Sequence, residues 1–281
     1  AFNQGLRLYQ SLRDRGGEAI ALNNVGEAHY LLGERQKAFD CFDRALPISR
    51  EVSARLAESL ILGNLGSVYN VRGEKQKALD YFDQALRLNR IVGPRGGEGE
   101  ILNNLGMIYN SIGEKRKALD HHNLALQIFR AVHDLGGEGG ALTSIGVIYV
   151  SLGENHEALD YFERALPFLR KTGDRRGEAV TLSSIGAVYT ILCEWQNALN
   201  HYQQSLLIQR DAKDRRGEAM TLNNMGRLYD SLGEERKALE YFDQSLIIRR
   251  EIEDRRGEAI TPNNIGLVHI ALGVNQSANE E

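Results

Sequence analysis

The chain has 281 residues and a formal net charge of −4, with 42% hydrophobic and 26% charged residues. This balance is typical of a folded domain, and it lacks the basic excess of a nucleic-acid-binding surface. No stretch approaches the ~18 consecutive apolar residues of a membrane span, so we expect no nucleic-acid or membrane partner. The two cysteines, Cys41 and Cys193, occupy different positions of an internal repeat, which argues against a disulfide framework and favours the cytoplasm.

The sequence is an array of 40-residue repeats without insertions or deletions. Residues 1–16 are amphipathic and predict a lone second helix before the first full repeat begins at Gly17. One glycine recurs in every repeat, at positions 26, 66, 106, 146, 186, 226 and 266. We therefore expect a single array that begins with a half repeat at 1–16. Six full repeats follow, at 17–56, 57–96, 97–136, 137–176, 177–216 and 217–256. A final first helix at 257–273 and a tail at 274–281 complete the array.

Each repeat predicts two helices that pack against each other. In repeat 57–96, one face of a first helix carries apolar and small residues at helical spacing, namely Leu62, Leu65, Gly66 and Tyr69. Gly73 ends that helix. A second helix follows and ends at Gly93 and Pro94, with Ala78, Phe82, Ala85 and Leu86 on one face. Small residues such as Gly66 and Ala78 allow the two helices to approach closely. One pair cannot bury its apolar face alone, so stability is expected to come from stacking.

This pattern resembles the tetratricopeptide repeat. The residues that carry the resemblance recur in register, in one repeat as Leu102, Leu105, Gly106, Tyr109, Ala118 and Ala125. The 40-residue period is longer than the common 34. The repeat sequence is similar to those of Pins/LGN polarity adaptors, of kinesin light chain, and of cyanobacterial arrays attached to CHAT-type protease or NTPase domains. The resemblance implies an all-α fold, a right-handed α-solenoid of antiparallel helix pairs. Because the chain starts inside a repeat, we expect it to be a piece of a longer protein.

Several positions depart from the pattern. His29 and His269 replace the tyrosine of the first helix, and His122 replaces the buried aromatic residue of the second. Cys193 stands where the glycine between the two helices belongs. Pro47 and Pro167 lie inside second helices, where each is expected to remove a backbone hydrogen bond and bend the helix.

A second face of the first helices carries two rows of polar residues. The amide row comprises Asn24, Asn64, Asn104, Asn224 and Asn264, with Ser144 and Ser184 in the two central repeats. The inner row, one residue earlier, comprises Asn23, Asn103, Asn223 and Asn263, with Thr143 and Ser183. In the resembling proteins this face lines a concave groove, and the asparagine bonds to the main chain of a bound peptide. The alternative is that these amides bond neighbouring helices of the array.

Positions on the same face that vary between repeats are expected to set specificity. These candidate partner-binding residues are Glu27, Asn70, Met107, Asn110, Val147, Arg227 and Asp230. The groove is expected to be polar at its ends and apolar in the middle, which favours a partner segment with a hydrophobic centre. A carboxylate clamp would need basic residues here, and only Arg227 is basic.

No other pattern indicates chemistry. His121 and His122 adjoin, but neighbours on a helix do not converge on a metal, and substitution within the repeat explains them. The recurring run GDRRGEA, as at Asp174, reads as a helix cap followed by a first-turn glutamate, with a basic ridge as the alternative. We find no phosphate-binding loop or hydrolase motif, so we expect no enzyme, cofactor or metal.

The sequence therefore predicts a scaffold or adaptor that binds a partner protein, as a peptide or a helix, in the groove. Two alternatives stay open: a regulatory or sensor module of a larger enzyme, and a homo-oligomer assembled through exposed solenoid ends.

Overall fold

The structure is a computed structural model that describes residues 2–255, 257–259, 261, 262 and 264–266. Throughout these residues the fold is helical, with no strand. The first helices of successive repeats are α2 (Arg15–Leu31), α4 (Arg55–Arg72), α6 (Arg95–Ser111), α8 (Leu135–Leu152), α10 (Arg175–Ile191) and α12 (Arg215–Ser231). The second helices are α1 (Phe2–Ser11), α3 (Arg35–Glu51), α5 (Lys75–Val92), α7 (Lys115–Ala131), α9 (Asn155–Thr172), α11 (Trp195–Asp211) and α13 (Glu235–Glu251).

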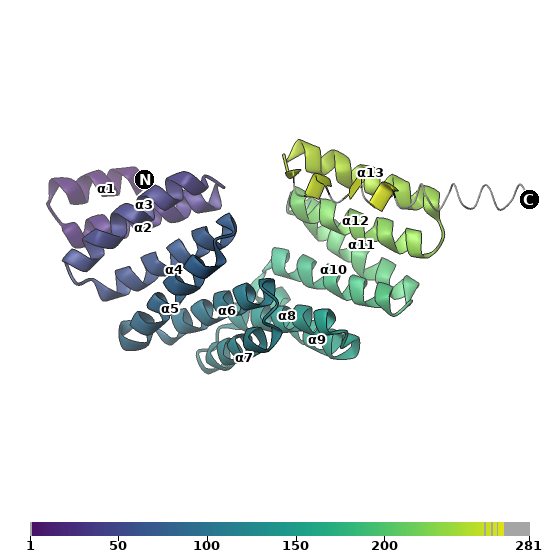
Figure 1. Ribbon diagram of the computed structural model, residues 1–281, viewed down its shortest axis with the longest axis horizontal. Helices are drawn as coiled ribbons and strands as arrows, with labels where there is room; N and C mark the ends of the chain where they lie inside the picture. Colours follow the sequence, from purple (N-terminus) through teal and green to yellow (C-terminus); the bar gives the residue numbers. More distant parts are fainter. Residues whose placement is uncertain (1, 256, 260, 263, 267–281) are drawn as a thin grey trace, which may run out of the picture. The chain divides into compact units, whose positions relative to one another are not determined.

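The chain forms two compact units, Ala1–Ser144 and Ile145–Glu281, with the boundary inside α8. Helices that adjoin in sequence pack against each other from α1 to α7 in the first unit and from α9 to α13 in the second (Figure 1). First helices also contact the next first helix, α2 with α4, α4 with α6, and α10 with α12. This arrangement brings the polar faces of successive first helices next to one another.

The repeated glycine sets the distance between the two helices of a pair. A Cβ atom built on Gly66 would lie 2.9 Å from the ring of Phe82, and one built on Gly146 would lie 2.6 Å from Phe162. Both phenylalanines are at most 1% exposed. Any side chain at these glycines would therefore collide with the aromatic residue of the partner helix, which confirms the predicted packing role.

Two kinds of turn join the helices. The turn inside a repeat uses a left-handed residue, as in Gly73 with φ +84°. Cys193 takes this conformation with φ +59°, although it carries a side chain. Four of the described first helices begin at an aspartate cap: Asp14, Asp134, Asp174 and Asp214. Each carboxylate accepts a hydrogen bond of 2.9 Å from the backbone N–H of the residue three positions later. The capping interpretation of the GDRRGEA run is confirmed at Asp174.

A recurring ion pair connects each repeat to the next. An arginine near the end of a second helix donates from Nε to a glutamate in the first turn of the following first helix, at 2.7–2.9 Å. The pairs are Arg50–Glu58, Arg90–Glu98, Arg130–Glu138, Arg170–Glu178, Arg210–Glu218 and Arg250–Glu258. Glu178 and Glu218 are almost fully buried. The first-turn glutamate therefore bonds across the repeat junction, a role that the sequence analysis did not assign.

The two helices that contain proline remain continuous. α3 extends four residues beyond Pro47, and α9 extends five beyond Pro167. Both prolines lie on the exposed side of their helices, where water can hydrate the carbonyl group that loses its N–H partner.

The predicted final first helix, 257–273, is described only in part, and its described residues are helical. His269 and the predicted tail 274–281 lie outside the described residues, as does Asn263.

Candidate functional site

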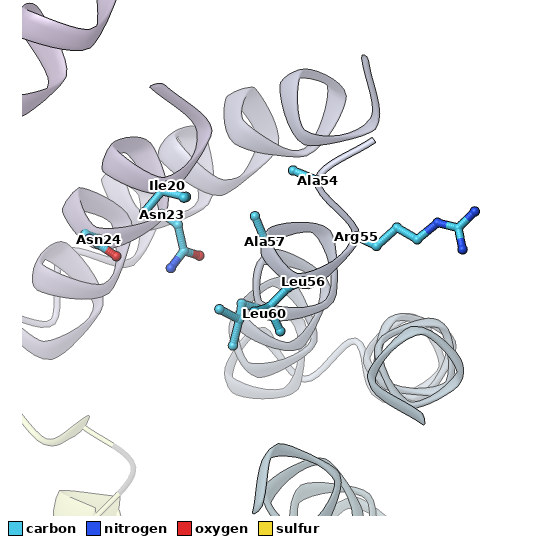
Figure 2. A pocket seen from close by; sticks show the side chains of 8 residues that line it. All are labelled: Ile20, Asn23, Asn24, Ala54, Arg55, Leu56, Ala57 and Leu60. Atoms are coloured by element: carbon cyan, nitrogen blue, oxygen red, sulfur yellow. The ribbon is translucent and has the colours of Figure 1, made fainter. Parts of the chain in front are cut away.

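The polar face of the first helices is hollowed where neighbouring first helices meet. The α2–α4 cavity has a volume of about 360 Å³ and is lined by Ile20, Asn23, Asn24, Ala57 and Leu60, among others. Figure 2 shows Ala57 and Leu60 of α4 facing Ile20 and Asn23 of α2, whereas Arg55 extends away from them. Ile20 and Leu60 are each 51% exposed, so the cavity presents apolar surface beside two amides.

Similar cavities occur further along both units. The α4–α6 cavity, of about 90 Å³, includes Asn64, Asn89, Gly97, Glu100 and Asn104 in its lining. The α10–α12 cavity, of about 140 Å³, includes Ser184, Gln209, Met220 and Asn224. Asn224 also contributes to a second hollow of about 90 Å³ that contains Arg227. Members of the amide row thus line a cavity in each unit.

The inner row is bonded inside the array. Asn23 is 5% exposed, and its Oδ1 accepts a bond of 2.9 Å from Nδ2 of Asn64 in the next repeat. Asn223, 7% exposed, accepts in the same way from Asn264 at 3.0 Å. Asn103 instead faces the Nδ1 of His122 at 2.8 Å. In these places the amides bond neighbouring helices, as the alternative interpretation of the rows expected.

Three members of the amide row have unengaged side chains. Among the described residues, no hydrogen bond involves the amides of Asn24, Asn104 or Asn224. Asn64 bonds to Asn23, which lies 41 residues earlier in the sequence. The residues 41 positions before Asn104 and Asn224 are Gly63 and Ser183, which carry no amide oxygen. These three half-buried amides keep both donor and acceptor available for a ligand.

The serines of the amide row direct their hydroxyl protons into their own helices. Ser144 donates to the carbonyl of Gly140 at 3.0 Å, and Ser184 donates to that of Val180 at 2.9 Å. Both oxygens can still accept a bond, but the donor of the amide row is lost in these two repeats.

The variable positions differ in how accessible they are. Met107 and Val147 are 50% and 39% exposed, and Arg227 and Asp230 are exposed without an ion pair to any described residue. Asn70 and Asn110 each accept a bond of 2.6 Å from a lysine that begins the next helix, Lys75 and Lys115. Glu27 accepts from both Asn23 and Asn64 at 2.9 Å, which makes it part of the inner network.

Two residues of the second helices lie at these cavities and were missed by the sequence analysis. Asn89 and Gln209 occupy the same repeat position and are 2% and 3% exposed. Their side-chain oxygens, Asn89 Oδ1 and Gln209 Oε1, are fully shielded and accept no hydrogen bond within the described part of the chain. The sequence does contain a sign of them, because a polar residue stands at a repeat position that holds Phe129 and Leu169 in other repeats.

The histidines take the places of aromatic residues. His121 packs on Tyr109 with ring centroids 4.9 Å apart, much as Tyr81 stacks on Tyr69 at 5.2 Å. His122 is 1% exposed, and burial, reinforced by the charge of His121, lowers its pKa from 6.5 to about 4. His122 is therefore a neutral core residue at physiological pH. The described residues contain no cluster of three metal-ligating side chains.

Neither cysteine is in a disulfide; Cys41 is half-buried and Cys193 is exposed. None of the described helices combines the length and apolar character needed to cross a membrane.

The comparisons with known proteins agree with this architecture. Tetratricopeptide repeat models match residues 19–53, 55–131, 98–171, 137–206 and 177–251. The chain belongs to the tetratricopeptide repeat family. No curated protein sequence matches it significantly.

Solved structures share the fold at low sequence identity. A Rap protein complexed with competence and sporulation factor is 16% identical, with 92% of this chain and 76% of that chain covered and a TM-score of 0.68. Kinesin light chain TPR-like repeats of Podosopora anserina are 15% identical, with 69% and 95% covered and a TM-score of 0.54. A STAND signal-transduction ATPase with a tetratricopeptide repeat sensor, from Pyrococcus horikoshii, is 16% identical, with 96% and 43% covered and a TM-score of 0.68.

Proposed function

We propose that the chain is a protein-interaction module that binds a segment of a partner protein on the polar face of its first helices. One observation carries the proposal: Asn24, Asn104 and Asn224 line cavities on this face, and their amides are unengaged within the described residues. Half-buried amides with free donors and acceptors suit the main chain of an extended or helical peptide, which offers the same groups in return.

The apolar surface beside the amides supports the same proposal. Ile20, Leu60 and Met107 are each at least half exposed on this face. An apolar side chain of the partner would gain about 25 cal/mol per Å² of surface that it removes from water here. The amides would then fix orientation and register, while the apolar cavities supply much of the affinity.

The experiment uses a displayed library of random peptides and the chain itself as bait. Peptides enriched on the wild type are synthesised, and their Kd values are measured for the wild type and for the double variant Asn104→Ala/Asn224→Ala. We expect the double variant to bind roughly tenfold more weakly or worse, since each amide can make one or two bonds. Asn123→Ala, an exposed asparagine of α7 outside this face, is the matched control and should not change affinity.

A library that yields no enriched peptide would count against peptide binding altogether. Enriched peptides that bind the double variant as tightly as the wild type would remove the amides from the site.

A second candidate is a sensor module within a larger enzyme. The observation that favours it is the shared fold with the tetratricopeptide repeat sensor of the STAND ATPase, which this chain matches over 96% of its length. The coding sequence around the array tests it: an adjoining CHAT-type protease or NTPase domain supports a sensor, and a stand-alone array rejects it.

A further inference from the structure

The α2–α4 cavity differs from the other cavities of this face in size and in lining. Its volume is about 360 Å³, compared with about 90 Å³ for the α4–α6 cavity and about 140 Å³ for the α10–α12 cavity. Three large apolar side chains line it, Ile20, Leu56 and Leu60, and each is close to half exposed. This volume is in the range of cavities that hold ligand groups, so the cavity has room for a whole apolar side chain.

The repeat register places this apolar surface between α2 and α4. Ile20 and Leu60 occupy the same repeat position, and the next two repeats hold Glu100 and Gly140 there. Two apolar side chains therefore face each other across the α2–α4 cavity (Figure 2), whereas Glu100 replaces one of them at the α4–α6 cavity. Their contact with water is a cost that a bound apolar group would remove.

A cation without an ion partner stands at the rim of the same cavity. Arg55 lines it, is exposed, and forms no ion pair with a described residue. Its equivalent Arg15 bonds to Glu51 of the following second helix at 2.8 Å, but Ile91 stands at the position of that glutamate in the repeat of Arg55. Glu58 bonds to the preceding second helix instead. No acidic residue is among the described residues that line the cavity, so its charge complements a carboxylate.

An unengaged amide completes the lining. Asn24 lies one helical turn after Ile20 and also lines the cavity, and no described residue bonds to its amide. The neighbouring Asn23 is different, because its oxygen already accepts from Asn64. The cavity thus combines apolar surface, a free donor and acceptor, and a positive charge.

We propose that the α2–α4 cavity is the anchor site of the partner segment: it takes a large apolar side chain, and Arg55 pairs with an aspartate or glutamate that flanks this side chain. The inference rests on the proposed function and names the partner chemistry that it leaves open. A leucine or phenylalanine would remove the exposed surface of Ile20 and Leu56 from water, while Asn24 bonds the adjoining main chain. Arg55 extends away from the apolar lining (Figure 2), so the carboxylate belongs to a flanking residue and not to the anchor.

The α10–α12 cavity provides an internal comparison. Val180 and Met220 occupy the same repeat position as the apolar pair of the first unit and are similarly exposed. This cavity is smaller, however, and no charged residue is among its described lining. The equivalent of the unpaired arginine is Arg215, which is bonded to Glu218 at 2.7 Å. An apolar anchor with an acidic neighbour therefore matches the α2–α4 cavity and not this one.

The test uses peptides selected from the random library on the wild-type chain. Each enriched peptide is synthesised again with its apolar anchor replaced by alanine, and separately with its acidic residue replaced by the corresponding amide. Kd values are measured for the wild type, Ile20→Ala/Leu56→Ala and Arg55→Gln. Because the replaced side chains are exposed or close to half exposed, both variants should keep the urea midpoint of the wild type.

Two matched controls come from equivalent positions. Val180→Ala/Met220→Ala removes a similarly exposed apolar pair from the other unit. Arg95→Gln removes an arginine of the same repeat position as Arg55 that is exposed, forms no ion pair with a described residue, and lies outside the lining of the α2–α4 cavity. Both controls should bind the peptides as the wild type does.

We expect the enriched peptides to share a large apolar residue with an aspartate or glutamate beside it. Loss of the apolar side chain should weaken binding to the wild type about tenfold or more, and should have a much smaller effect in Ile20→Ala/Leu56→Ala. Neutralisation of the acidic residue should weaken binding to the wild type about two- to fivefold, since the ion pair stays accessible to water, and should have little effect in Arg55→Gln.

The outcomes that would overturn the inference are distinguishable. Peptides that bind Ile20→Ala/Leu56→Ala as tightly as the wild type, yet lose affinity in Asn104→Ala/Asn224→Ala, would overturn the anchor site and leave the proposed function intact. An equal loss on neutralisation in the wild type and in Arg55→Gln would overturn the role of Arg55. A wild-type dimer in sedimentation that disappears in Ile20→Ala/Leu56→Ala would assign the cavity to a second copy of the chain. A library without any enriched peptide would overturn the proposed function and this inference with it.

Discussion

At the scale of single residues, the two polar rows separate into bonded and unengaged amides. Asn64 donates to Asn23 of the preceding repeat, whereas the residue at the position of Asn23 in the repeat before Asn104 is Gly63, which has no side chain to bond. The sequence located both rows on one helix face, because helical spacing determines the face. It did not show which amides are bonded, because that depends on pairs 41 residues apart whose distance is set by the stacking of first helices.

The left-handed turn residue Cys193 gives a prediction about stability. A side chain at φ +59° costs roughly 1–2 kcal/mol, and glycine avoids this cost. We expect Cys193→Gly to raise the free energy of unfolding by about 0.5–1 kcal/mol in urea titrations, after the entropy that glycine adds to the unfolded chain. Cys193→Ala keeps the strained backbone and should show no such gain; an equal gain in both variants would attribute the effect to the thiol.

The buried His122 gives a prediction about pH. Its pKa is about 4 in the folded chain and about 6.5 when unfolded, so between these values the unfolded state binds more protons. The stability associated with neutral His122 is therefore fully present above pH 6.5 and is lost as the pH falls towards 4. The total loss is about 3 kcal/mol.

The variant His122→Phe restores the aromatic residue of the other repeats and cannot take up a proton. The difference in unfolding free energy between the wild type and this variant should change with pH between 6.5 and 4, in favour of the variant at low pH. A difference that stays constant over this range would show that His122 is accessible to protons in the folded chain.

At the scale of helices, the sequence predicted the pairs and their glycine contacts but not the bonds at the repeat junctions. The close packing of Gly66 against Phe82 follows from a local motif, a recurring glycine in the first helix and a ring in the second. The arginine–glutamate pairs also recur every 40 residues, yet the glutamate has a simpler explanation in the helix dipole. Only the stacking of one repeat on the next shows that it reaches the arginine of the preceding helix.

Glu218 offers the sharpest test of these junctions. It is 6% exposed and accepts bonds from Arg210 at 2.9 Å and Arg215 at 2.7 Å. We expect Glu218→Ala to lower the free energy of unfolding by about 1–3 kcal/mol, because a buried charge-assisted bond is lost and a gap remains. Because stability in repeat proteins depends on interfaces between neighbours, the urea transition should also broaden.

Glu240, which is exposed and forms no ion pair with a described residue, provides the control for this experiment. Glu240→Ala should stay within about 0.5 kcal/mol of the wild type. Equal effects at both glutamates would show that the junction bond contributes nothing specific.

At the scale of the whole molecule, the described first helices α2, α4 and α6 begin 40 residues apart, at Arg15, Arg55 and Arg95, which is the period of the sequence repeat. The helix bounds differ slightly, since α2 begins at Arg15, two residues before the block that starts at Gly17. The cavities could not be predicted, because they arise between repeats. Asn89 and Gln209 illustrate this: their sequence position marks them as core residues, and only the packing shows that no described residue donates to their oxygens.

We propose that unengaged amides on the first helices bind a partner, whereas bonded amides hold the array together. The two roles separate when the peptide Kd and the free energy of unfolding are measured side by side for Asn104→Ala/Asn224→Ala and for Asn64→Ala. We predict that the first variant loses roughly tenfold in affinity at nearly unchanged stability, while Asn64→Ala loses about 1 kcal/mol of stability, because it breaks the bond to Asn23. Unchanged affinity in the double variant, with its stability lowered as much as that of Asn64→Ala, would show that Asn104 and Asn224 are structural residues and do not bind the peptide.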